Sequence, residues 1–162
     1  MDRWEVCLGG TFSPIHKGHL MLFERAFTVG KVVRVGLTSD EFATRGRKRA
    51  VPPYVVRERD LRKVLDGISA TYDVPYSIAM ITDRVGFADG AEIEAIVVSR
   101  ETERNLGPID HARTLKGLPL LRRFVVDMVL DGEGKVLSST RVQNGEVDAE
   151  GRTKVRGRGG ED

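Results

Sequence analysis

Two histidines stand three residues apart at the start of a predicted helix, directly after a glycine-containing turn. His16 and His19 flank Gly18 and follow residues 9–14, which read GGTFSP. Residues three apart on a helix share a face, so both imidazoles are expected to project toward one point. Free backbone N–H groups of the turn and of the helix N-terminus stabilise an anion at such a place. The pattern therefore indicates chemistry at a phosphate group.

A structural role and zinc ligation are the two alternative uses of this histidine pair. In the first, the side chains would only satisfy local hydrogen bonds. Zinc needs three or four protein ligands, and only Cys7 and His111 could add to the pair. Cys7 falls in an apolar strand segment and His111 in a distant polar stretch. We therefore favour phosphate binding and expect no metal held by protein ligands alone.

The elements that position these residues alternate between strand and helix. Apolar runs predict strands at 4–8, 32–37, 76–81, 95–98 and 124–129. Helical spacing and capping signals predict helices at 18–29, from 38–41 onward, around 61–68, at 102–115 and at 139–143. Gly30 is expected as the C′ residue of the first helix, Gly67 as the end of the third, and Gly107-Pro108 as an interruption of the fourth.

Strands separated by helices of this length imply βαβ units. The expected fold class is therefore α/β, a doubly wound and mostly parallel five-stranded sheet. Ligands bind beyond the carboxyl ends of the strands in such sheets. The residues that directly follow the strands are therefore the candidates for a site.

Length and composition are those of one ordinary globular domain. The chain has 162 residues, of which 40% are hydrophobic and 31% charged. One cysteine, no signal peptide and no apolar run of transmembrane length predict a cytoplasmic protein without disulfides. A net charge of +2 gives little reason to expect nucleic acid or a membrane as a partner. We expect a domain over residues 1–149, a disordered glycine-rich tail over 150–162, and a monomer or small homo-oligomer.

Two further polar clusters and Ser99 are additional candidates for a site. Residues 45–49 read RGRKR and could hold substrate phosphates, form a solvated charged loop or, less favourably without aromatic neighbours, bind nucleic acid. Ser138–Arg141 combine small hydroxyl side chains with a guanidinium at a helix start, a second candidate phosphate cradle. N-capping alone would explain the serines of this cluster, and it would also explain Ser99.

Together these motifs resemble those of the nucleotidyltransferase superfamily that carries the H-x-G-H signature. Residues 10–19, GTFSPIHKGH, are similar to its G-T-F-D-P-x-H-x-G-H motif, although Ser13 replaces the aspartate. Residues 138–142, SSTRV, are similar to its I-S-S-T-R-I motif. More narrowly, residues 36–43, 97–102 and 138–148 resemble archaeal phosphopantetheine adenylyltransferases and the related domain of eukaryotic coenzyme A synthase. The similarity covers residues 5–148 and implies a Rossmann-like nucleotidyltransferase fold.

The resemblance implies transfer of AMP from ATP to 4′-phosphopantetheine, giving dephospho-coenzyme A and pyrophosphate. It implies Mg²⁺ carried by the nucleotide phosphates, and His16 and His19 as catalytic residues. The implied ATP contacts are Gly10, Thr11, Phe12, His16, Gly18, His19, Ser99, Ser138, Ser139, Thr140 and Arg141. The candidates for binding the acceptor phosphate are Thr11, Arg47, Lys48 and Arg100. The apolar arm of the acceptor would lie in a groove, to which residues 52–54, PPY, could contribute.

Two other readings stay open at this point. The same chemistry could act on another phosphorylated acceptor, such as nicotinamide mononucleotide, FMN or a phospho-alcohol activated with CTP. A catalytically silent module that binds a nucleotide or RNA would keep the fold without the reaction. Intact His16, His19 and Ser138–Arg141 argue against a silent module.

Overall fold

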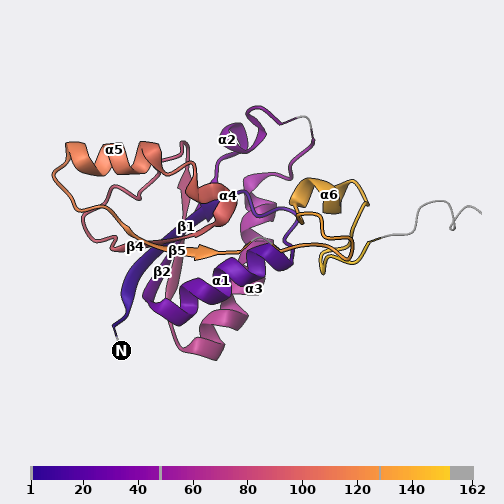
Figure 1. The fold of residues 1–162 in the computed structure, drawn as a ribbon, viewed down its shortest axis with the longest axis horizontal. Helices are drawn as coiled ribbons and strands as arrows, with labels where there is room; N and C mark the ends of the chain where they lie inside the picture. Colours follow the sequence, from indigo (N-terminus) through magenta and orange to yellow (C-terminus); the bar gives the residue numbers. More distant parts are fainter. Residues whose placement is uncertain (1, 48, 128, 154–162) are drawn as a thin grey trace, which may run out of the picture.

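The computed structural model describes residues 2–47, 49–127 and 129–153. In this part of the chain five strands form one parallel sheet in the order β3-β2-β1-β4-β5 (Figure 1). The strands are β1 (Trp4–Gly10), β2 (Gly30–Thr38), β3 (Tyr76–Ile81), β4 (Ala95–Ser99) and β5 (Arg122–Val126). The predicted α/β fold with a five-stranded parallel sheet is confirmed.

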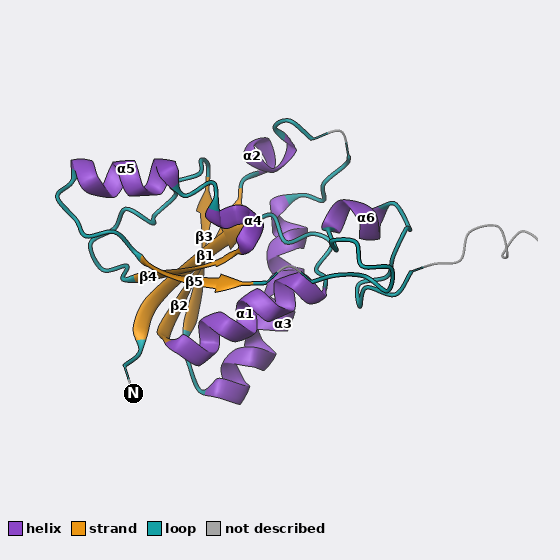
Figure 2. Ribbon diagram, viewed as in Figure 1, coloured by secondary structure: helices purple, strands orange, loops and turns teal. Residues whose placement is uncertain are grey.

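Helices cover both faces of this sheet. They are α1 (Lys17–Val29), α2 (Asp40–Thr44), α3 (Tyr54–Tyr72), α4 (Arg100–Glu103), α5 (Gly107–Leu115) and α6 (Ser139–Gln143). Figure 2 shows α1 and α3 on one side of the sheet and α5 on the other. No helix within the described ranges is long and apolar enough to cross a membrane.

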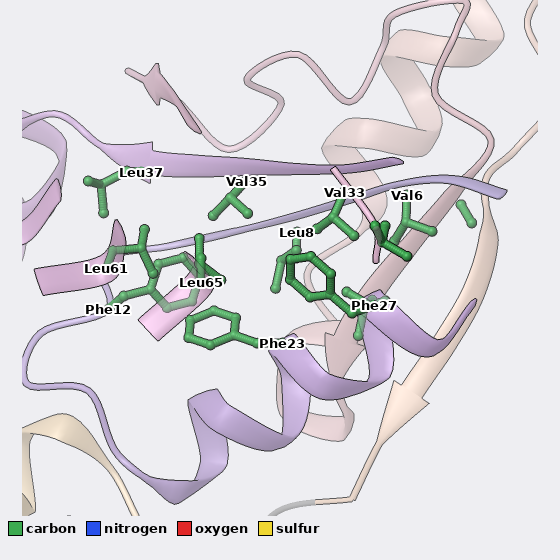
Figure 3. Close-up of a cluster of buried hydrophobic side chains, with 14 residues drawn as sticks. Val6, Leu8, Phe12, Phe23, Phe27, Val33, Val35, Leu37, Leu61 and Leu65 are labelled. Carbon is green, nitrogen blue, oxygen red and sulfur yellow. The ribbon is translucent and has the colours of Figure 1, made fainter. Parts of the chain in front are cut away.

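The alternation of side chains along the strands divides the core into two layers. Val6 and Leu8 of β1 belong to the layer that packs on α1 and α3 (Figure 3). Cys7, between them, belongs to the layer that packs on α5. The first layer is aromatic and aliphatic, with Phe12, Phe23, Phe27, Leu61 and Leu65 fully or almost fully buried. Both core layers therefore pack against β1 and support the turn that follows it.

One predicted helix boundary is wrong because packing overrides the local signal. Helix α3 continues past Gly67 to Tyr72, and Asp73 forms its C-cap with a φ of 54°. Ile68 and Tyr72 still pack against the core, so burial sustains the helix through the glycine. The interruption predicted at Gly107-Pro108 is confirmed, because the helix expected at 102–115 is two helices, α4 and α5, divided before Gly107.

The ends of two strands also differ from expectation. Gly30 has an extended conformation and opens β2 directly, so it is not a left-handed C′ residue. Thr38 closes β2 and does not cap a helix; Ser39 caps α2 by accepting a hydrogen bond from the Phe42 N–H. Strand β5 begins and ends before the predicted 124–129 range does, at 122 and 126.

The ordered domain extends further than predicted at its C-terminal end. The Gly132 N–H donates to the Gly151 carbonyl at 3.1 Å, and the Asp148 N–H donates to the Arg152 carbonyl at 2.9 Å. The boundary predicted at 149/150 is therefore too early, because residues 150–153 pair with earlier backbone. Residues 154–162 of the predicted tail lie outside the described residues.

Candidate active site

A cavity of about 390 Å³ lies beyond the carboxyl ends of β1 and β4. Most of the predicted site residues line it: Gly10, Thr11, Phe12, His16, Gly18, His19, Arg47, Ser99, Ser138, Ser139 and Thr140. Arg100 and Arg141 do not line it, and Lys48 lies outside the described residues. The fold thus joins the turn after β1, the basic loop 45–49 and the start of α6, which are far apart in the sequence.

Backbone N–H groups fix both imidazoles of the histidine pair. The N–H of Gly18 donates to His16 Nδ1 at 3.0 Å, and the N–H of His16 donates to His19 Nδ1 at 3.2 Å. The two rings stack with centroids 3.8 Å apart. Since each Nδ1 accepts a hydrogen bond, the proton of a neutral ring is assigned to Nε2. Among the described residues neither Nε2 has a hydrogen-bond partner, so both Nε2–H groups can donate to a ligand.

Burial keeps these two rings neutral. It lowers the pKa of His16 to about 4. For His19, burial and then the positive charges of His16 and Arg49 lower the pKa to about 3. At neutral pH the pair is therefore uncharged, and the sequence could not distinguish this state from a cationic one.

Phe12 and Gly18 shape the histidine pair from the protein side. The buried ring of Phe12 packs edge-on against His19, with centroids 5.2 Å apart, and against Phe23 at 5.0 Å. A Cβ at Gly18 would lie 2.8 Å from His16 Cε1. The glycine therefore makes room for the His16 ring.

Side-chain and backbone bonds tie the start of α6 to the histidine loop. Ser138 Oγ accepts from the Arg141 N–H and caps α6. Ser139 Oγ donates to the Pro14 carbonyl at 2.8 Å, two residues before His16. Figure 1 shows α6 beside the N-terminal end of α1. The hydroxyl side chains of this segment and the histidines therefore line one cavity.

Arg141 has a different place from the one the sequence indicates. Its Nε donates to Glu146 at 2.9 Å, Nη1 donates to the Val136 carbonyl at 2.8 Å, and Nη2 pairs with Asp131. The Asp131 carboxylate also accepts the N–H groups of Glu133 and Lys135. Arg141 thus braces the loop that precedes α6, and its guanidinium is not at the cavity.

The basic loop reaches the cavity through two of its arginines. Arg47 Nη1 donates to Thr11 Oγ1 at 2.9 Å. Arg49 Nη1 donates to Gln143 Oε1 at 3.0 Å, and the side-chain amide of Gln143 donates to the Ala50 carbonyl. Burial, and then the charges of Arg49 and Arg57, lower the pKa of Arg47. Such crowding of positive charge favours an anion beside Arg47.

Arg100 lies outside this cluster, on the surface. Its guanidinium forms an ion pair with Asp127 at 2.7 Å, and both side chains are largely exposed. The carboxylate raises the pKa of Arg100. Arg100 was a candidate for the acceptor phosphate, but only its partner Asp127 lines the cavity.

A second cavity of about 310 Å³ adjoins the first. Thr11, Arg47 and Ser99 line both cavities. The rest of its wall is largely apolar and includes Phe42, Ile81, Ile96, Val98, Leu106 and Ile109. Residues 52–54, expected in an apolar groove, do not line it; Pro53 is the N-cap of α3, which begins at Tyr54.

Sequence reasoning missed two residues beneath the site, Thr38 and Arg57. Thr38 stands at the carboxyl end of β2. The rule that ligands bind beyond the carboxyl ends of parallel strands could have identified it. Arg57 looks like an ordinary polar residue of a helix, and only the fold reveals that its side chain is buried. Within the described ranges, no group of three or more histidine, cysteine or acidic side chains is arranged to hold a metal ion.

Comparisons with known proteins agree with this geometry. Residues 7–145 match the family model described as cytidylyltransferase-like. The phosphopantetheine adenylyltransferase of Methanothermobacter thermautotrophicus is 40% identical over 159 residues, which cover 95% of this chain and 92% of that protein. The enzyme of the same name from Archaeoglobus fulgidus is 34% identical over 148 residues, with 91% and 97% covered. A crystal structure of a protein of unknown function, also from Archaeoglobus fulgidus, aligns with a TM-score of 0.66 at 32% identity, covering 76% of this chain and 89% of that one.

Proposed function

The chain belongs to the cytidylyltransferase-like family and, within it, to the phosphopantetheine adenylyltransferases, and from this premise we propose how its two adjoining cavities divide the substrates. The reaction moves AMP from ATP to 4′-phosphopantetheine and releases pyrophosphate. We assign ATP to the 390 Å³ cavity beside the histidines and the acceptor to the 310 Å³ cavity. The observation that carries this assignment is that Thr11 and Arg47 line both.

A phosphate held by Thr11 and Arg47 lies where the two cavities meet. One side of that position is the cavity with the histidine pair and Ser138–Thr140, whose polar side chains suit a triphosphate. The other side is the largely apolar cavity, which suits a long pantetheine arm. The acceptor phosphate can thus face the α-phosphorus of ATP from the junction.

No covalent nucleophile is needed for this transfer. An oxygen of the acceptor phosphate attacks the α-phosphorus, and the bond to the leaving pyrophosphate breaks in line with it. Both reactants are anions, so the protein has to position them and stabilise the charge that collects on the α-phosphate. The Nε2–H groups of His16 and His19 are the fixed donors for that charge. Because the rings are neutral, they donate hydrogen bonds without transferring a proton.

The residues that line the ATP cavity fit a magnesium ion carried by the nucleotide. Mg²⁺ binds phosphate oxygens, waters and at most one or two carboxylates in such sites. Glu101 and Asp127 are the acidic side chains among the lining residues, and Asp127 already pairs with Arg100. The ion would neutralise phosphate charge, and Glu101 could hold one of its waters.

Pyrophosphate release from the purified protein tests the assignment. With ATP, 4′-phosphopantetheine should react far faster than nicotinamide mononucleotide or FMN. Pantetheine without the phosphate should be nearly inert, because it lacks both the nucleophile and the group that Arg47 binds. Comparable kcat/KM for nicotinamide mononucleotide would contradict the acceptor assignment and leave adenylyl transfer standing. A faster reaction with CTP than with ATP would contradict the assignment of ATP as the nucleotide substrate.

A further inference from the structure

Arg57 of α3 lies buried beneath the junction of the two cavities. Its side chain has 0% exposure. Nε donates to the Pro52 carbonyl at 2.8 Å, Nη2 donates to Asp40 at 3.0 Å, and Nη1 donates to Thr38 Oγ1 at 3.1 Å. One planar guanidinium thus reaches three acceptors in different directions, which a lysine could not do.

A second hydrogen bond joins Thr38 to Thr11. Arginine only donates, so Thr38 Oγ1 accepts from Arg57. Thr38 Oγ1 also lies 2.9 Å from Thr11 Oγ1, and one of these two buried hydroxyls must donate to the other. Thr11 Oγ1 accepts from Arg47 in the same way, so either hydroxyl can be the donor of this bond. A phosphate oxygen beside Thr11 can only accept, so with a phosphate bound Thr38 donates to Thr11 and no buried hydroxyl proton is left unpaired.

This direction leaves the Thr11 proton free. In this direction Thr11 Oγ1 accepts from Thr38 on one side and from Arg47 Nη1 on the other. Both lone pairs of the oxygen are then occupied, and its hydrogen has to point elsewhere. Since Thr11 lines both cavities, the open direction is toward the ligand.

We propose that Arg57 is a positioning residue which, through Thr38, holds the Thr11 hydroxyl as a hydrogen-bond donor to the acceptor phosphate. The inference rests on the proposed function, in which Thr11 and Arg47 bind that phosphate. The relay runs from Arg57 through Thr38 to Thr11, and no hydrogen bond among the described residues joins these side chains to those of the histidines or of Ser138–Thr140. Its loss should therefore weaken acceptor binding and leave ATP binding intact.

Replacing Thr38 tests the relay with little change in volume. Thr38→Val should raise the KM for 4′-phosphopantetheine about tenfold, with the KM for ATP within about twofold of wild type. Thr38→Ser keeps the hydroxyl and should restore the acceptor KM to within about twofold. Thr71→Val is the matched control, because Thr71 is exposed on α3 and its hydroxyl donates to the Gly67 carbonyl of the same helix. Equal increases in both KM values, or none, would overturn the relay.

A double-mutant cycle separates action through Thr11 from a direct or structural effect. Thr11→Val should raise the acceptor KM, and adding Thr38→Val should raise it no further. Additive effects would show that Thr38 does not act through Thr11. Arg57→Lys should reproduce the acceptor phenotype of Thr38→Val, whereas Arg113→Lys, at a buried arginine that donates only to backbone carbonyls, should change stability alone. Unchanged acceptor KM in Arg57→Lys would also contradict the proposal.

Failure of the relay and failure of the proposed function give different results. If the wild-type protein does not turn over 4′-phosphopantetheine with ATP, the proposed function is wrong. If the wild-type protein is active and Thr38→Val has the same KM values as the wild type, only the relay is wrong. The melting temperatures of all variants, measured beside the kinetics, show which losses come from unfolding.

Discussion

On the histidine side of the cavity backbone groups fix the donors, whereas on the basic-loop side the donors are held by other side chains. His16 and His19 accept hydrogen bonds from backbone N–H groups, and the ring of Phe12 supports His19. Arg47 and Arg49 instead reach across to the side chains of Thr11 and Gln143. The histidines are also neutral, and the arginines carry charge.

This difference suggests a division of labour between the two sides. Neutral donors in a fixed geometry are suited to charge that develops only in the transition state, where preorganisation has its largest effect. Charged side chains attract an anion before and during the reaction alike and contribute mainly to binding. Substitutions on the histidine side should therefore lower kcat, and substitutions on the basic loop should raise the KM of the acceptor.

The largest effect is expected for His19. His19→Ala should lower kcat by about 10²–10³-fold, the loss typical of removing one fixed donor to a developing anion. His111→Ala, at an exposed histidine of α5, should leave kcat unchanged. Steady-state kinetics with both substrates and a melting curve check this. Near-normal turnover in His19→Ala would refute the proposed role of the pair.

A subtler change at Gly18 tests whether the geometry of the pair matters. The new Cβ of Gly18→Ala would lie 2.8 Å from His16 Cε1 and displace the ring, so we expect kcat to fall about tenfold with KM values little changed. In Gly67→Ala nothing lies within 4 Å of the new Cβ, and this helical site should gain about 0.5–1 kcal/mol of stability. If Gly18→Ala keeps full kcat, the exact placement of the His16 ring is unimportant.

The sequence predicts each side of the cavity, the histidine side and the basic-loop side, only as far as the contacts of that side are local in the chain. The histidine turn was predictable, because the glycines, the helix start and the pair at i and i+3 lie within about ten residues of one another. The placement of Arg47 was predictable only as one of several possibilities for a charged loop. Its contact with Thr11 depends on the ends of β1 and β2 lying side by side.

Arg57 and Arg141 show that some side-chain contacts cannot be predicted from the neighbouring residues in the sequence. Arg141 follows three hydroxyl residues and looks like a phosphate ligand, yet Asp131 and Glu146 take up its guanidinium. Arg57 looks like a surface residue, yet it is as buried as the core leucines. In both cases the partner is chosen by tertiary structure. The neutral state of the histidines has the same origin, since burial lowers their pKa.

Removing the charge of Arg47 should weaken binding of the acceptor and leave the rate of the chemical step unchanged. Arg47→Gln is expected to raise the KM for 4′-phosphopantetheine about five- to tenfold, with kcat and the KM for ATP within about twofold of wild type. Arg45→Gln is the control in the same loop, because Arg45 pairs with Glu41 and does not line either cavity. A fall in kcat with unchanged KM would reverse the division of labour.

The smallest effect is a pH dependence of stability that only the histidine side should produce. The folded protein holds His16 and His19 neutral, with pKa values of about 4 and about 3. The unfolded chain binds protons at both once the pH falls below the ordinary histidine value of about 6.5. The contribution of the pair to stability is therefore complete above about pH 6.5 and is lost progressively as the pH falls toward 3–4.

Urea unfolding at pH 7 and pH 5 measures this loss. The wild type should lose about 1 kcal/mol for each histidine between the two pH values, after allowance for their partial exposure. His19→Gln, which cannot titrate, should lose about half as much, because only His16 is left to bind a proton on unfolding. His111→Gln, at an exposed position, should lose as much as the wild type. An equal loss of unfolding free energy in His19→Gln and in the wild type would mean that the fold does not hold His19 neutral. The histidine side would then resemble the basic loop as a second source of positive charge.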